Sequence, residues 1–136
     1  MRDRRHLRAL IGTSVVIDLE SIDPTSLPRE VAISAITMAE LAAGPHATRD
    51  PHERARRQDR LQRAEATFDP LPFDAAAARA YGRLWTAAWA AGRKARGGRA
   101  VDLLIAATAV STGLPLYTRN PGDFAGLSDL LEIVPV

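Results

Sequence analysis

Three acidic residues stand where the ends of predicted strands or the starts of predicted helices can bring them together. Glu40 follows the apolar residues 31–34, Asp102 begins an almost wholly apolar helix, and Asp123 follows the apolar residues 114–118. In an open α/β sheet a ligand site lies beyond the carboxyl ends of the strands. Clustered carboxylates, together with waters and phosphate oxygens, hold hard cations such as Mg2+ or Mn2+. The three acids are therefore candidates for a metal site that hydrolyses a phosphodiester bond.

Taken singly, each acid also has a purely structural interpretation. Thr37 and Glu40 have the spacing of a capping box, in which the glutamate only satisfies backbone donors. Asp102 has the position of a helix N-cap, and Asp123 is a common turn residue within Asn-Pro-Gly-Asp. Convergence distinguishes the two interpretations, because carboxylates held close together without a cation repel one another.

Strands alternate with helices along the chain, and this alternation predicts an α/β fold with a parallel sheet covered on both faces. Ser14 is expected to cap the first helix, and Gly113 is expected to end the last one. The expected strands cover residues 7–11, 31–34, 114–118 and 132–136, and the expected helices cover residues 15–20, 37–43, 51–68, 74–91 and 102–112.

Length and composition indicate one ordinary globular domain, residues 1–136. Hydrophobic residues make up 46% of the chain and charged residues 25%, which excludes a disordered or fibrous class. The sequence contains no cysteine, so it has no disulfide framework and favours an intracellular, cytoplasmic protein. No apolar run approaches the roughly 18 residues that span a bilayer. The net charge of +2 is compatible with nucleic acid but does not by itself indicate a partner.

Four sequence strings together resemble the PIN-domain ribonucleases. They are LIGTSVVIDL, TMAEL, GRAVDLLIAATA and YTRNPGDF, and they occur in the family's order between residues 10 and 136. The match is close to the VapC branch, the toxins of type II toxin–antitoxin systems. The resemblance implies a PIN-like three-layer α/β/α sandwich with a central, mainly parallel sheet.

The resemblance also implies roles for individual residues. Glu40, Asp102 and Asp123 are the implied catalytic and metal-binding acids of an endoribonuclease dependent on Mg2+ or Mn2+. The implied partners are RNA, a cognate VapB-type antitoxin whose C-terminal segment covers the groove, and a second copy of the chain. The implied supporting residues are Thr13 and Ser14, through their hydroxyls, and Asn120, which would orient a carboxylate or a water.

Gly12 stands where the family has an aspartate that binds the metal directly. Losing one carboxylate removes a negative charge and a coordination bond, so we expect weaker metal binding and slower turnover. Asp18 does not replace the missing acid, since it lies about 1.5 helical turns further on and faces another direction. An alternative function is therefore a catalytically impaired PIN module that binds antitoxin or RNA. A nucleotide-binding domain is disfavoured, because no G-x-G-x-x-G or P-loop follows the first strand.

A basic segment lies directly before Asp102 and could contact RNA phosphates, although such loops are often only solvated. Its basic residues are Arg93, Lys94, Arg96 and Arg99.

A second group of residues recurs at helical spacing before this segment. It favours core packing, or contact with a subunit or antitoxin, over a platform for base stacking. The residues of this group are Tyr81, Leu84, Trp85 and Trp89.

Overall fold

The computed structural model describes residues 6–93 and 97–136, and its centre is a four-stranded parallel sheet. The strand order is β2-β1-β3-β4, and every neighbouring pair runs parallel. This confirms the α/β class. The strands are β1 (Arg8–Ile11), β2 (Glu30–Ala32), β3 (Leu116–Thr118) and β4 (Ile133–Pro135).

Helices connect successive strands, as a parallel sheet requires. The α-helices are α1 (Thr13–Ile17), α2 (Ala35–Ala43), α3 (Pro51–Thr67), α4 (Ala75–Ala90) and α5 (Gly98–Thr112). The short 3-10 helices are η1 (Leu19–Ser21), η2 (Pro24–Ser26), η3 (Gly44–Ala47) and η4 (Pro121–Phe124).

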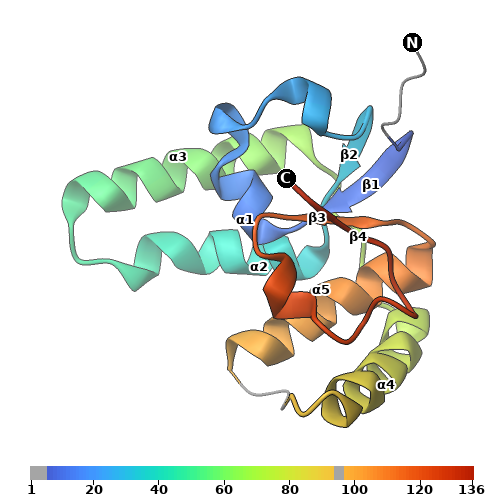
Figure 1. Cartoon of the computed structure of the whole chain (residues 1–136). Helices are drawn as coiled ribbons and strands as arrows, with labels where there is room; N and C mark the ends of the chain where they lie inside the picture. Colours follow the sequence, from blue (N-terminus) through green and yellow to red (C-terminus); the bar gives the residue numbers. More distant parts are fainter. Residues whose placement is uncertain (1–5, 94–96) are drawn as a thin grey trace.

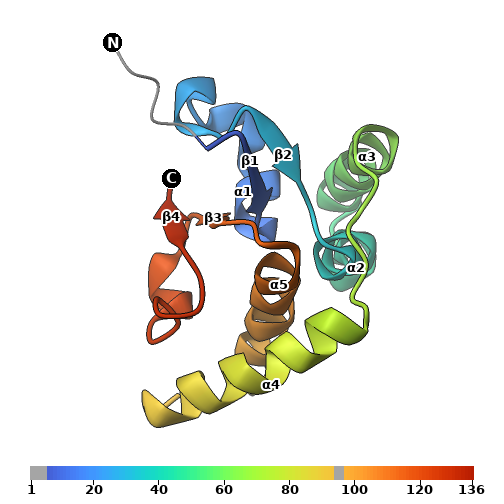
Figure 2. The same ribbon diagram turned by 90° about the vertical axis from the view of Figure 1, so that its right-hand side faces the viewer.

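The two faces of the sheet carry separate hydrophobic clusters, which makes the fold a three-layer sandwich. Leu10 of β1 packs with α4 and α5, whereas Ala9 and Ile11, on the opposite face, pack with α1, α2 and α3. Side chains alternate between faces along a strand, so the three buried apolar residues at the end of β1 serve both clusters. Figures 1 and 2 show α4 and α5 together below the strands, with α2 and α3 forming a second pair away from them.

From β1 the chain continues to β2 on one side of the sheet and then crosses to β3 and β4 on the other side. The boundary between β1 and β3 is therefore the point at which the strand order reverses. β1 continues into α1, and β3 continues into η4, so both connections leave the carboxyl edge of the sheet at the same point. The Gly12 N–H donates to the Tyr117 carbonyl across 3.0 Å, which ties the two strand ends together. A crevice at such a switch point is the usual ligand site of an open parallel sheet.

Several helix starts differ from those predicted by local capping patterns. The N-cap of α1 is Gly12, without a side-chain cap, so the prediction for Ser14 was wrong. Ser34 caps α2 by accepting the Thr37 N–H across 3.0 Å, which places the helix start before the predicted capping box. Asp102 is not an N-cap either, because α5 begins at Gly98.

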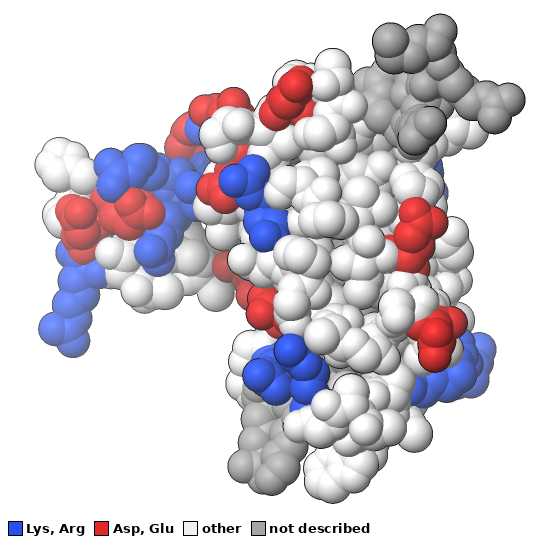
Figure 3. Space-filling model, viewed as in Figure 1, with Lys and Arg blue, Asp and Glu red and all other residues white. Residues whose placement is uncertain are grey.

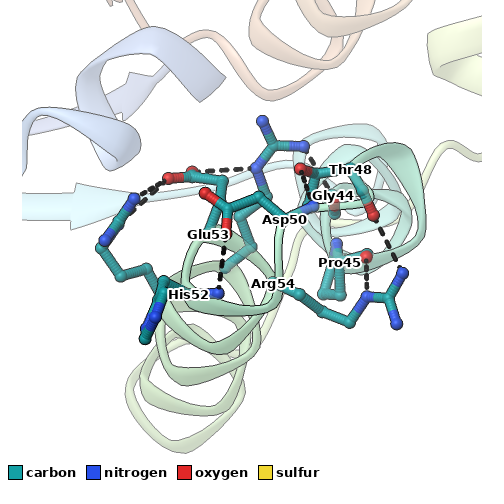
Figure 4. A network of polar contacts seen from close by, with 9 residues as sticks. Gly44, Pro45, Thr48, Asp50, His52, Glu53 and Arg54 are labelled. Atoms are coloured by element: carbon teal, nitrogen blue, oxygen red, sulfur yellow. Dashed lines mark hydrogen bonds and ion pairs between the residues drawn. The ribbon is translucent and has the colours of Figure 1, made fainter.

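A polar network fixes the start of α3 against η3 (Figure 4). Asp50 caps α3 by accepting the His52 N–H. Arg54 donates to the Pro45 carbonyl, and Glu53 accepts from two arginines one helical turn further along. These contacts hold α2, η3 and α3 as one arm, visible at the left of Figure 1.

Within residues 6–93 and 97–136, no helix is long and apolar enough to cross a membrane.

Candidate active site

The three predicted acids lie on elements that meet at the carboxyl edge of the sheet. Glu40 is on α2, which follows β2, and Asp123 is in η4, which follows β3. Asp102 is near the start of α5, whose other end leads into the beginning of β3. The start of α5 therefore faces the opposite, carboxyl edge of the sheet. The topology brings three segments that are distant in sequence to one place.

The Asp102 carboxyl is half buried, and the charges of the two other acids act on it. Burial, followed by the negative charges of Asp123 and Glu40, raises the pKa of the Asp102 carboxyl from 3.8 to about 6, and Arg99 opposes this rise. Charges act on a half-buried group in this way only when they are nearby. No three acidic or histidine side chains in the described ranges, however, are close enough to enclose one ion. The charges of the three acids interact, but among the described residues their side chains do not form a complete metal-binding site.

Glu40 is held by hydroxyl groups rather than by backbone donors. Thr13 Oγ1 donates to Glu40 Oε1 across 2.6 Å, and the same hydroxyl lies 3.0 Å from Thr37 Oγ1. Thr37 is fully buried and in turn lies 3.3 Å from Ser34 Oγ. The capping-box interpretation of Glu40 is therefore wrong, and a chain of hydroxyls orients this carboxylate. Thr37 was not among the predicted site residues, because its Ser34-x-x-Thr37 spacing indicates the cap of α2 but not the tertiary contact with Thr13.

Ser14 and Asn120 organise the backbone that carries Asp123. Ser14 Oγ accepts the Arg119 N–H across 3.3 Å, joining α1 to the segment after β3. The Asn120 carbonyl accepts the Asp123 N–H across 3.0 Å and so closes the turn of η4. Neither contact joins a side chain to a carboxylate. Both contacts instead hold the main chain of the segment that carries Asp123.

Gly12 occupies an ordinary extended conformation at the end of β1, with φ −75° and ψ 170°. A Cβ added there would meet its nearest atom, the Tyr117 carbonyl oxygen, at 3.5 Å, which is normal van der Waals contact. Glycine is therefore not required by the backbone at this position, and a Cβ fits there without strain.

Two of the four basic residues predicted to contact RNA, Arg93 and Arg99, lie beside Asp123. Arg99 is in the first turn of α5, and with Arg93 and Asp123 it lines one small hollow. Figure 3 shows a blue group directly next to red atoms in the corner between the arm and the body. Lys94 and Arg96 lie outside the described residues.

A larger groove lies away from the three acids, between α1–η1 and α3, and its volume is about 450 Å³. Its apolar lining includes Leu19, Ala64 and Phe68. Arg56, Arg60 and Arg63 give the groove a basic rim, although Asp18, Glu20 and Asp59 also border it. Its size and composition suit a peptide segment better than a small metal centre.

Replacing Asp102 by asparagine is expected to stabilise the metal-free protein at neutral pH. The pKa of Asp102 is about 6 when folded and near 3.8 when unfolded, so the folded state binds the proton more tightly. The free energy of unfolding therefore falls as the pH rises from about 4 to 6. The variant's advantage is absent below pH 4 and reaches about 1–2 kcal/mol above pH 6, after allowance for solvent screening.

Urea unfolding in EDTA at pH 4 and pH 7.5 measures this difference. Asp129→Asn, which changes an exposed acid, is the matched control. An equal effect of Asp102→Asn at both pH values would contradict the expected coupling to charge.

Comparison with known proteins places this site in a family. The PIN domain family matches residues 9–129, which is most of the chain, so the chain is a PIN domain. Ribonuclease VapC5 of Mycobacterium tuberculosis (strain ATCC 25618 / H37Rv) is 38% identical over 127 residues, covering 91% of this chain and 90% of that protein. The chain therefore belongs to the VapC toxin family.

Solved structures agree with this assignment. The crystal structure of VapBC-5 from Mycobacterium tuberculosis, a member of the VapBC family of toxin–antitoxin systems, matches with a TM-score of 0.83 and 36% identity. That match covers 96% of this chain and 99% of the other. VapBC2 from Rickettsia felis, bound to a DNA fragment from its promoter, has a TM-score of 0.73 at 23% identity, covers 95% of this chain and 98% of its own, and shares the fold. The expected PIN-like architecture is confirmed.

Proposed function

We propose that this chain is the toxin of a type II toxin–antitoxin system and hydrolyses RNA phosphodiester bonds in the cytoplasm with Mg2+ or Mn2+. The observation that carries the proposal is that Glu40, Asp102 and Asp123 lie on elements that meet at the carboxyl edge of the sheet, where the charges of Asp123 and Glu40 help to raise the pKa of Asp102. A bound divalent cation removes the mutual repulsion that these carboxylates otherwise suffer. The membership of the chain in the VapC family supports the same activity.

The chemistry of the donors fits a hard cation. Carboxylate oxygens are the preferred protein ligands of Mg2+ and Mn2+, and Mg2+ ordinarily keeps several waters. Asp102 is the central candidate ligand, because both other acids act on it. Since the described side chains form no cage of three, we assign the remaining positions to waters and RNA phosphate oxygens. When bound, the metal supplies an activated water and neutralises charge on the cleaved phosphodiester.

The chain's own residues position the reacting groups. Thr13 keeps Glu40 turned toward the end of β1, and the turn closed by Asn120 fixes the place of Asp123. Arg93 and Arg99 provide positive charge where the RNA backbone approaches the acids. The Thr13 hydroxyl and the Asn120 carbonyl carry no net charge, so they orient the carboxylates without competing with them for the metal.

The partner we propose is a VapB-type antitoxin, since the solved relatives from Mycobacterium tuberculosis and Rickettsia felis are both VapBC pairs. The groove between α1–η1 and α3 suits a bound antitoxin segment, because apolar residues line it beneath charged side chains. We also propose that the toxin forms a homodimer.

Purified full-length chain should cut a 5′-labelled structured RNA in Mn2+ or Mg2+ and leave it intact in EDTA. Discrete end-labelled fragments on a denaturing gel measure the cleavage, and Asp102→Asn purified in parallel controls for contaminating nucleases. Absence of cutting with either metal, at micromolar protein, would refute the enzymatic part of the proposal.

The second candidate function is a PIN module that binds antitoxin or RNA without efficient cleavage. It is favoured by Gly12 and by the absence of a three-acid cage among the described residues. Titration calorimetry separates the two functions. No heat of binding with millimolar Mg2+ or Mn2+, together with retained RNA binding, would identify the chain as a binder.

A further inference from the structure

Glu40 is an exposed side chain whose direction depends on a single hydroxyl group. Its carboxylate accepts the Thr13 hydroxyl across 2.6 Å, and within residues 6–93 and 97–136 it accepts no other hydrogen bond. An exposed glutamate loses conformational entropy when its side chain is fixed, so it needs a partner that is itself fixed. The direction of the Glu40 carboxylate therefore depends on what holds the Thr13 hydroxyl.

The Thr13 hydroxyl has two neighbours but only one hydrogen to donate. Thr13 Oγ1 lies 2.6 Å from Glu40 Oε1 and 3.0 Å from Thr37 Oγ1. An ionised carboxylate can only accept a hydrogen bond, and 2.6 Å is a typical distance for a hydroxyl that donates to one. Thr13 therefore donates to Glu40. The contact of 3.0 Å then needs its hydrogen from Thr37.

Ser34 completes the same order of hydrogens further inside the protein. Ser34 Oγ accepts the Thr37 N–H across 3.0 Å and lies 3.3 Å from Thr37 Oγ1. Both residues are fully buried. If Thr37 donated back to Ser34, the oxygens of Thr37 and Thr13 would face each other across 3.0 Å without a hydrogen. An ionised Glu40 therefore fixes the order of donation, which runs from Ser34 through Thr37 and Thr13 to Glu40.

The placement of the helices makes Thr13 the link between two side chains of α2. Thr37 and Glu40 are three positions apart on α2, so their side chains are neighbours on one side of that helix. Thr13 is the first residue of α1 and contacts both of them. A change at Thr37 can therefore reach Glu40 through Thr13, although Thr37 itself is buried.

We propose that Thr37 is a positioning residue of the active site: its buried hydroxyl donates to Thr13 and so leaves the single Thr13 hydrogen for Glu40. Hydrogen bonds in such a chain polarise one another, and the negative charge at its end strengthens each of them. The consequence for metal binding rests on the function proposed above. The order of the hydrogens rests on the hydrogen bonds alone.

Urea unfolding in EDTA at pH 7.5 tests the order of the hydrogens without any metal. Thr37→Val removes the hydroxyl and should lower the free energy of unfolding. The loss should be smaller in a Glu40→Gln background, because the amide has no charge to polarise the chain. Thr108→Val is the matched control, since Thr108 is also fully buried but donates to the Leu104 carbonyl. Its effect should be the same in both backgrounds.

Equal losses from Thr37→Val with glutamate and with glutamine at position 40 would overturn the inference. That result would mean that the Thr37 hydroxyl only satisfies a buried hydrogen-bonding group. Thr37→Ser retains the hydroxyl and should restore the difference between the two backgrounds.

Calorimetric titration with Mn2+ in the absence of RNA tests the consequence for the site. Thr37→Val should bind Mn2+ roughly 3-fold more weakly, as expected for the loss of one neutral hydrogen bond. Thr37→Ser and Thr108→Val should keep the wild-type affinity. In a Thr13→Val background, Thr37→Val should cause no further loss, because the link to Glu40 is already broken. Losses that add would show that Thr37 acts by another route and would reject the inference.

Cleavage kinetics separate positioning from RNA binding. Thr37→Val should lower kcat and leave KM for RNA unchanged, since Thr37 is buried and does not reach the substrate. A higher KM with unchanged kcat would contradict the proposed role. A wild-type chain that neither binds Mn2+ nor cuts RNA would refute the proposed function, and the unfolding measurements in EDTA would still decide the inference. Conversely, unfolding losses that are equal in both backgrounds leave the proposed nuclease untouched.

Discussion

Asp102→Asn is expected to reduce the rate of RNA cleavage at least about 100-fold at saturating Mn2+. The substitution keeps the size of the side chain but removes the charge on which both other acids act. Initial rates of cleavage of a fluorescent RNA, measured across a Mn2+ series, give the loss in turnover and in metal affinity separately. Asp129→Asn should retain the wild-type rate.

This variant also separates chemistry from folding. Because Asp102→Asn is expected to be the more stable protein at neutral pH, its loss of activity cannot be attributed to unfolding. A variant that cuts RNA at the wild-type rate would remove Asp102 from the catalytic machinery, and the assignment of Glu40 and Asp123 would lose its centre.

Gly12→Asp is expected to tighten divalent-metal binding on the order of 10-fold and to increase cleavage correspondingly. The backbone at Gly12 accepts any residue, and the nearest atom to an added Cβ is at a normal contact distance. The new carboxylate would stand at the end of β1, next to the edge where the other acids converge. Calorimetric titration with Mn2+ and cleavage assays at limiting metal measure both effects.

Gly12→Asn is the matched control, since it adds the same volume without the charge. If the aspartate and asparagine variants bind metal alike, the glycine does not mark a missing ligand. Equal activity of the wild type and Gly12→Asp would lead to the same conclusion.

The order of strands and helices could be predicted from the sequence, but the exact helix starts could not. The apolar segments around Leu10 and Leu116 identified buried strands because they serve clusters on both faces of the sheet. Local capping patterns failed at Ser14 and Asp102, where the helix begins earlier than the polar residue suggested. A serine or aspartate near a helix start satisfies a cap pattern in sequence even when tertiary contacts recruit its side chain elsewhere.

The convergence of the acids could be predicted from topology, whereas their supports could not. Carboxyl ends of parallel strands share an edge, so the segments that carry Glu40 and Asp123 were expected at the same edge of the sheet. The hydroxyl chain through Thr13 and Thr37 depends on the packing of α1 against α2, which no spacing in the sequence reveals. Helical periodicity likewise predicted that Leu84 and Trp89 belong to the core or to a contact surface, but it could not tell which; Leu84 is buried, whereas Trp89 is exposed.

The pairing of β1 with β3 also has a consequence during synthesis. Ser14 and Arg119, which the fold joins, are 105 positions apart. A ribosome translating this chain has therefore made β1, β2 and all the helices α1–α5 before Asp123 exists to meet the other acids. If Asp123 takes part in cleavage as proposed, the enzyme gains its activity only after β3 and the segment that follows it have been made.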